Sequence, residues 1–139
     1  MHIARLQASD AAPYRELMLQ AYETAADAFT STAEERAAEP DAFWTRRIAD
    51  PAGMGVAFGA FEAQALVGTV ALAFSARPKT RHKAEVVGMY VAPSARGAGV
   101  GRALLGAAIA HAGTRAGLLL LTLTVTEGNE AAQRVYQRP

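Results

Sequence analysis

The sequence predicts an α+β fold in which helices flank a mixed central β-sheet. Residues 56–62 and 66–75 are apolar, β-favouring runs joined by a tight connection, which is typical of an antiparallel hairpin. Residues 86–91 and 118–126 are two further strand-like runs, and the apolar segment 100–112 between them has the length of a helix. Two strands joined by a crossover helix run parallel in one sheet. Antiparallel and parallel pairs in one chain therefore predict a mixed sheet.

The segment before the hairpin is expected to begin with a strand and a helix. Residues 2–7 alternate loosely between apolar and polar side chains, which predicts a short strand. Ser9 or Asp10 can cap a helix that has Pro13 in its first turn. Apolar side chains at helical spacing extend this helix to about residue 28.

A second, shorter helix is expected after a polar segment. Residues 30–40 fit either a loop or a loosely held helical turn. Asp41 can cap a helix that ends before Pro51. Phe43 and Trp44 on this helix are interpreted as core residues, with the wall of a binding pocket as the alternative.

Length and composition predict a single domain over residues 1–139. The net charge of +1 gives no general attraction to nucleic acid or to acidic lipid, and no apolar run reaches membrane-spanning length. Since the chain contains no cysteine, it has no disulfide, thiolate nucleophile or cysteine-bound metal. Together with an N-terminus that lacks the apolar core of a signal peptide, this composition favours a cytoplasmic location.

A glycine-rich turn between residues 91 and 100 joins the central strand to the long helix. The first turn of a helix has free N–H groups and the positive end of the helix dipole, so the turn predicts a phosphate site. The sequence Gly101-Arg102-Ala103 differs from the Gly-Lys-Ser/Thr end of a Walker A loop. A dinucleotide fingerprint requires a glycine where Arg102 stands.

The pattern that these residues do match is Arg-x-x-Gly-x-Gly, at Arg96, Gly99 and Gly101. With Tyr-Val-Ala-Pro at residues 90–93, it closely resembles the acyl-coenzyme A loop of the GCN5-related N-acetyltransferase (GNAT) family. The order of elements resembles this family over essentially the whole chain, and most strongly over residues 84–136. The resemblance implies the family's three-layer fold.

The resemblance also implies acetyl-CoA as co-substrate, an amine as acceptor, and no requirement for metal. The pantetheine arm of the coenzyme would lie between two parallel strands that diverge. Main-chain groups of Met89 and Val91, with Tyr90 between them, would bind this arm and the thioester oxygen. The residues expected to hold the pyrophosphate are Arg96, Gly97, Ala98, Gly99, Val100, Gly101 and Arg102.

A second family signature, Asn-x-x-Ala-x-x-x-Tyr, begins at Asn129 and ends at Tyr136. We expect a last helix here, capped by Asn129, in which a spacing of seven residues places both side chains on one face. Asn129 would then bind the pantetheine arm, and Tyr136 would donate its proton to the departing sulfur. The alternatives are a simple helix cap for Asn129 and a core aromatic for Tyr136.

The general base is the least specified part of the predicted site. Glu85, at the start of the central strand, is the preferred candidate. Glu127, His82 and His111 are the other titratable candidates.

The C-terminus departs from the family pattern, because members normally continue beyond Tyr136 into one or two further strands. These strands are expected to be missing or supplied by a partner chain. Residues 118–125 would then form an apolar strand with an exposed edge, which predicts a homodimer.

The preferred function is therefore transfer of an acetyl group from acetyl-CoA to a primary amine of a small molecule or a protein. The alternatives are a coenzyme-binding module or truncated fragment with impaired catalysis, and a binding protein for another phosphate ligand.

Overall fold

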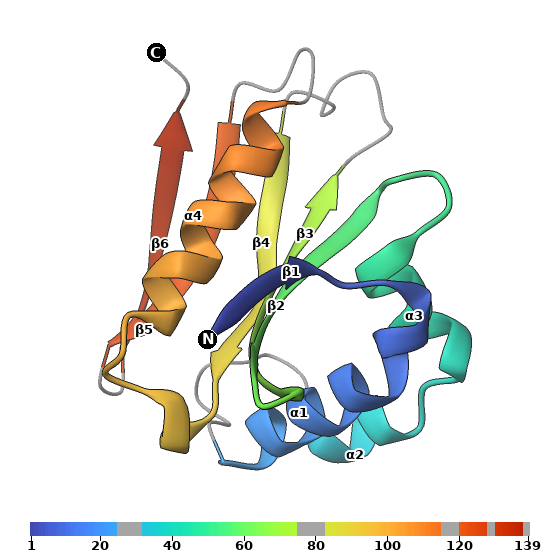
Figure 1. The fold of residues 1–139 in the computed structure, drawn as a ribbon. Helices are drawn as coiled ribbons and strands as arrows, with labels where there is room; N and C mark the ends of the chain where they lie inside the picture. The colour runs from blue at the N-terminus through green and yellow to red at the C-terminus, as the bar shows by residue number, and fades with distance from the viewer. Residues whose placement is uncertain (25–31, 75–82, 115–119, 128–129, 138–139) are drawn as a thin grey trace.

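The computed structural model describes residues 1–24, 32–74, 83–114, 120–127 and 130–137, the last two segments by their backbone (Figure 1). Six described strands form one mixed sheet in the order β1-β2-β3-β4-β5-β6. They are β1 (His2–Arg5), β2 (Gly55–Glu62), β3 (Ala65–Phe74), β4 (Lys83–Val91), β5 (Leu120–Glu127) and β6 (Glu130–Gln137). The helices are α1 (Ala11–Thr24), α2 (Ala33–Ala37), α3 (Asp41–Ala49) and α4 (Val100–Gly113). None of these described helices is long and apolar enough to cross a membrane.

The predicted α+β class and mixed sheet are confirmed. β2 and β3 form the expected antiparallel hairpin, and β4 and β5 run parallel. Ala63 and Gln64 connect β2 to β3 with positive φ angles of 49° and 71°, the backbone that a two-residue hairpin turn with right-twisted strands requires. Residues 33–37, which the sequence left open between loop and helical turn, form the short helix α2.

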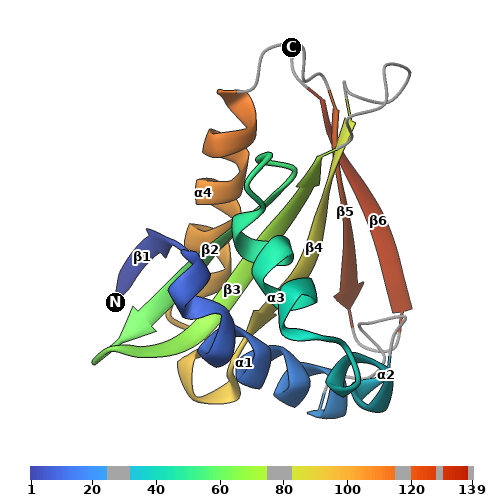
Figure 2. The same cartoon turned by 90° about the vertical axis from the view of Figure 1, so that its right-hand side faces the viewer.

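Helices cover both faces of the sheet, and each face has its own core. On one face, α1 and α3 pack through large buried side chains that include Tyr14, Met18 and Trp44. On the other face, α4 presents a buried stripe at helical spacing, formed by Val100, Leu104, Ala108 and Ala112. The result is the expected three-layer arrangement of helices, sheet and helix (Figure 2).

α4 approaches the sheet closely where β3 has no side chain. A Cβ atom on Gly68 would lie 3.1 Å from Leu104 Cδ1 and 3.1 Å from Val100 Cγ1. The absence of a side chain at this position therefore lets the first two turns of α4 pack directly against the strand.

The predicted last helix is wrong, because residues Glu130–Gln137 form strand β6, which pairs antiparallel with β5 over its whole length. Alanine, glutamate and glutamine favour a helix here, but an isolated two-turn helix is marginal. Pairing with β5 instead satisfies a full row of backbone groups. The two strands are separated by Gly128-Asn129 in sequence, a pair that favours a two-residue hairpin connection.

The expected exposed edge of residues 118–125 is also wrong for the described part, Leu120–Val125. β5 pairs with β4 on one side and with β6 on the other, so a later strand of this chain covers the edge. The exposed edge of β5 from which a homodimer was predicted is therefore covered, and β6 is the edge strand at this side of the sheet.

Candidate active site

The parallel strands β4 and β5 separate halfway along their length. Their pairing begins at Lys83 and Leu120 and ends at Val86 and Leu123. β4 continues to Val91 and β5 to Glu127 without further pairing between them, and Figure 2 shows the two strands diverging toward these ends. Main-chain groups along this stretch are therefore available to an extended ligand.

A bulge in β4 faces this separation. Thr69 of β3 pairs with Tyr90 and Ala71 pairs with Val87, so Gly88 and Met89 together oppose a single residue of β3. The extra residue changes which side chains point to each face. Tyr90 packs in the core beside α1, whereas Met89 and Val91 pack against the α4 side.

The main chain of Val91 points into the separation rather than toward β3. Ala92 N–H donates to Val67 O at 2.8 Å, and neighbouring residues of a strand direct their backbone groups to opposite edges. Val91 O accepts instead from Arg96 Nε at 3.0 Å. Val91 O therefore faces the separation between β4 and β5 and bonds to a side chain of the glycine-rich loop.

The backbone of the glycine-rich loop is unobstructed by side chains where it leads into the first turn of α4. Gly97 and Gly99 have φ angles of +87° and +79°, which favour glycine, and a Cβ atom on either would meet nothing within 4 Å. Gly99 is the N-cap of α4 and has no side chain to bond the first-turn N–H groups. Ala103 N donates to Gly99 O at 3.0 Å, so the N–H groups before it precede the first intrahelical bond.

The remaining loop residues anchor this turn. Val100, the first residue of α4, is buried in the core between α4 and the sheet, whereas Ala98 and Arg102 are exposed. A Cβ atom on Gly101 would lie 3.5 Å from Met89 Cε and 3.8 Å from Val91 Cγ2, so the first turn of α4 stands beside the bulged part of β4. The structure thus brings together the predicted residues 89–91 and 96–102 at one end of the sheet (Figure 1).

Tyr90 connects this end of the sheet to α1. Its hydroxyl lies 3.2 Å from Thr24 Oγ1, at the C-terminal end of α1, and the Arg96 guanidinium carbon lies 5.7 Å from the centre of its ring. Thr24 was missed by sequence reasoning, because a threonine in the last turn of a helix carries no signal of a contact 66 residues away.

Glu85 lies on β4 before the strands separate. It pairs with Ala73 of β3 and Thr122 of β5, and its side chain is exposed. Strand alternation places it on the same face as Val87, which packs against the core of α1 and α3. A carboxylate here faces the helical layer that carries Thr24 rather than the layer of α4.

Tyr136 lies on a strand and not on the expected helix. Tyr136 lies on β6, where its backbone pairs with Leu121, in the part of β5 that is still joined to β4. Asn129 lies outside the described residues, as does His82. The roles assigned to these residues stay predictions.

The other two titratable candidates lie apart from the loop. His111 is in the last turn of α4, with its ring centre 5.8 Å from that of Phe58 and 6.1 Å from that of Phe74. Ten residues separate it from Gly101, or about 15 Å along the helix. Glu127 is the last residue of β5, where that strand has separated from β4.

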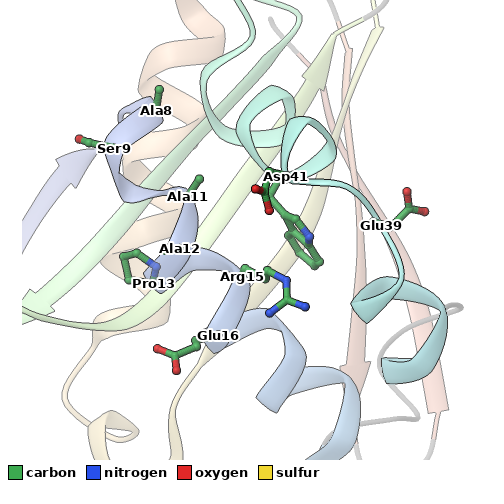
Figure 3. A pocket seen from close by; sticks show the side chains of 10 residues that line it. Ala8, Ser9, Ala11, Ala12, Pro13, Arg15, Glu16, Glu39 and Asp41 are labelled. Atoms are coloured by element: carbon green, nitrogen blue, oxygen red, sulfur yellow. The ribbon is translucent and has the colours of Figure 1, made fainter.

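A hollow of about 810 Å³ lies beside the N-terminal half of α1. Its lining includes Arg15 and Glu16 of α1, Glu39, and Asp41 and Trp44 of α3, and Figure 3 shows Arg15 between Glu16 and Asp41. Glu16, the α1 lining residue nearest to Thr24 in sequence, precedes it by eight residues, or about 12 Å along the helix. Among the described side chains, no group of three or more His, Asp or Glu is arranged to hold a metal ion.

Comparison with solved structures identifies the same fold in several acetyltransferases. A probable acetyltransferase from Staphylococcus epidermidis ATCC 12228 has a TM-score of 0.70 at 21% identity, covering 89% of this chain and 72% of that chain. A predicted acetyltransferase from Clostridium acetobutylicum, solved with acetyl-CoA, has a TM-score of 0.70 at 18% identity, covering 91% and 81%. A ribosomal-protein-alanine N-acetyltransferase from Brucella melitensis biovar Abortus 2308 has a TM-score of 0.63 at 26% identity, covering 91% and 81%.

The family comparison extends over most of the sequence. No curated protein matches the chain. The model of the acetyltransferase (GNAT) family matches residues 17–138, which include the whole of β4, the glycine-rich loop and α4. The chain therefore belongs to the GNAT acetyltransferase family.

Proposed function

We propose that the protein transfers an acetyl group from acetyl-CoA to a primary amine by direct attack of the amine on the thioester. The observation that carries this proposal is the separation of β4 from β5 directly beside the uncapped N-terminus of α4. An extended arm fits main-chain groups along a strand, and a pyrophosphate fits the first turn of a helix. The related Clostridium protein, solved with acetyl-CoA, supports the same ligand.

Each part of the site has a defined task in this proposal. Main-chain groups of Met89 and Val91 bind the pantetheine arm and orient the thioester oxygen, a role that suits fixed N–H donors. Residues 96–102 hold the pyrophosphate. Asn129 is proposed as a further partner of the arm. Arg96 Nε donates to the Val91 carbonyl at 3.0 Å, and this oxygen can accept a second hydrogen bond from the arm.

Proton transfer is assigned to two residues. Glu85, exposed on the face of the sheet that carries α1, is proposed to take the proton of the amine directly or through water. Tyr136 is proposed to give a proton to the departing sulfur. We expect the reaction to take place in the cytoplasm.

The coenzyme site is tested by calorimetry with acetyl-CoA. Gly99→Glu adds a side chain and a negative charge to an open loop, so we expect affinity to fall at least tenfold, about 1.4 kcal/mol. Gly106→Glu is the matched control, because Gly106 is exposed on α4 and a Cβ atom there also meets nothing within 4 Å. Equal affinity of the wild type and Gly99→Glu would place the coenzyme elsewhere.

Catalysis is tested by release of free CoA in the presence of an amine panel. An acetyltransferase releases CoA in proportion to acetylated amine. Tight binding of acetyl-CoA with no turnover of any amine would instead support a coenzyme-binding module. Tight binding of ATP without binding of acetyl-CoA would support another phosphate ligand.

A further inference from the structure

Three buried donors in the helical layer have no hydrogen-bond partner among the described residues. They are the Tyr14 hydroxyl on α1, Arg36 Nε on α2 and Trp44 Nε1 on α3. Tyr14 is 0% exposed and Trp44 is 1% exposed. Buried polar groups in folded proteins are nearly always paired, so three unpaired donors in one layer indicate an absent acceptor.

Two guanidinium groups lie beside these donors. The Arg36 guanidinium carbon is 4.9 Å from the centre of the Phe43 ring, and that of Arg47 is 5.7 Å from the same ring. Glu39 approaches Arg36 at 3.9 Å, at the limit of an ion pair. Among the described residues, no carboxylate lies within 4.0 Å of the Arg47 guanidinium. Two positive charges therefore share one aromatic ring with little compensation.

The aromatic rings join these groups into one cluster. Trp44 contacts Tyr14 and Phe43, with ring centres 6.0 and 5.0 Å apart. Burial raises the pKa of Tyr14 to about 12, although the nearby positive charge of Arg47 opposes this rise. The Tyr14 hydroxyl is thus a neutral donor beside Arg47 at physiological pH. We call Tyr14, Arg36, Phe43, Trp44 and Arg47 the Arg36–Arg47 cluster.

We propose that the Arg36–Arg47 cluster binds a carboxylate, and that this carboxylate belongs to the amine acceptor. The acceptors would then be amines that carry an acid group, such as amino acids. A guanidinium matches a carboxylate with two parallel N–H bonds, and a carboxylate accepts further bonds from neutral donors. This assignment rests on the proposed acetyl transfer and names the substrate class for it.

The cluster reaches toward the separated strands along α1. The Arg36 guanidinium carbon lies 5.9 Å from the centre of the Tyr22 ring. Tyr22 and Tyr90 belong to the same buried core on this face of the sheet. An acceptor held by its acid group at Arg36 therefore lies on the sheet face that carries Tyr90 and Glu85.

Trp44 provides a direct readout, because it is the only tryptophan in the sequence. The protein is titrated with N-acetylglycine and with the neutral isostere N-acetylglycinamide while Trp44 fluorescence is followed. We expect the acid to change the emission with saturation and the amide to leave it unchanged. Arg47→Gln should weaken the response to the acid at least tenfold. Equal responses to acid and amide, or none to the acid, would overturn the proposal and would indicate that water satisfies the donors.

Two control variants separate this cluster from other positive charges. Arg46→Gln removes an exposed arginine next to Arg47 on α3, and Arg15→Gln removes the arginine of the hollow in Figure 3. Both should keep the wild-type response to N-acetylglycine. A response lost in Arg15→Gln and retained in Arg47→Gln would place the acid in the hollow and would contradict the proposal.

Tyr14→Phe distinguishes ligand binding from a structural role. It keeps the ring and removes only the hydroxyl, which lies beside Arg47. We expect weaker binding of N-acetylglycine with a melting temperature that does not fall. A lower melting temperature with unchanged binding would show that the hydroxyl serves the fold and would contradict its part in the site.

Steady-state acetylation of glycine and glycinamide connects the site to the reaction. Arg47→Gln should raise KM for glycine at least tenfold, change kcat less, and leave KM for glycinamide unchanged. Transfer to both acceptors with the same response to Arg47→Gln would overturn the inference and leave the proposed function intact. If no amine is acetylated but Trp44 still distinguishes acid from amide, the carboxylate site stands, whereas the acceptor assignment falls with the proposed function.

Discussion

Tyr14 is expected to lower the free energy of unfolding as the pH becomes alkaline. Its pKa is about 12 in the folded protein and about 10 when exposed, so folding favours the neutral phenol. This contribution is fully present below pH 10 and is lost as the pH rises from 10 toward 12. The loss amounts to roughly 3 kcal/mol at about 1.4 kcal/mol per pKa unit.

Urea unfolding at pH 9 and pH 11.5 tests this dependence. Tyr14→Phe removes the titrating hydroxyl, so its free energy of unfolding should fall less between the two pH values than that of the wild type. Parallel losses in the two proteins would show that other groups cause the alkaline transition.

Tyr136 is the residue whose proposed role the fold supports least, because its backbone pairs with Leu121 rather than lying beside the loop. As a general acid, Tyr136→Phe should lower kcat by about a hundredfold or more, with acetyl-CoA affinity nearly unchanged. Stopped-flow release of CoA measures the chemical step directly. A reduction below threefold in that step would leave Tyr136 as a packing residue of β6.

Helix α4 depends on one buried leucine more than on its neighbour. Leu104 is fully buried against β3, whereas Leu105 is only half-buried. Leu104→Ala should lower the free energy of unfolding by about 2–5 kcal/mol, because it leaves a cavity between α4 and the sheet. Leu105→Ala is the matched control and should cost clearly less. Urea midpoints of the two variants provide the comparison, and equal losses would contradict the packing described for this helix.

Strand β6 protects the outer edge of β5. Deleting residues 130–139 would leave the backbone groups of β5 unpaired along that edge, so the shortened chain should associate through it. Light scattering over a range of concentrations measures the change relative to the intact chain. A shortened chain that stays monomeric would show that another part of the protein covers β5.

The homodimer expected from the sequence remains a prediction for the intact chain, but any pairing at this end of the sheet would involve β6. The same light-scattering series tests it. A single monomeric species at the highest concentration would remove the prediction.

Local patterns were sufficient to predict most of the molecule. The connection at Ala63-Gln64, the presence of helix α4 and the glycine-rich loop each depend on residues close in sequence, so local patterns were enough to predict them. The prediction of a helix at residues 130–137 was wrong because their composition favours a helix locally. The edge of β5 with which they pair exists only in the assembled sheet. The Gly128-Asn129 pair was the signal that favoured a hairpin.

The candidate site was predictable only in part for the same reason. The pattern of residues 96–102 predicted a phosphate loop at the start of α4, but the point where β4 separates from β5 depends on the register between distant strands. The Arg36–Arg47 cluster depends on how α2 and α3 pack beside α1, which no spacing within either helix reports.

The close contact of α4 with Gly68 has a consequence for the size of molecule that fits this protein. In the proposed site, main-chain groups of β4 bind one part of the coenzyme, and the N–H groups of the first turn of α4 bind another part that is covalently linked to the first. The spacing between these two elements is limited by the missing side chain on β3, where an added methyl group would meet Val100 and Leu104 at 3.1 Å. Gly68→Ala would require the Val100 and Leu104 side chains to move by a few tenths of an ångström. A residue of β3, outside the glycine-rich loop, therefore limits how far apart the two proposed coenzyme contacts lie.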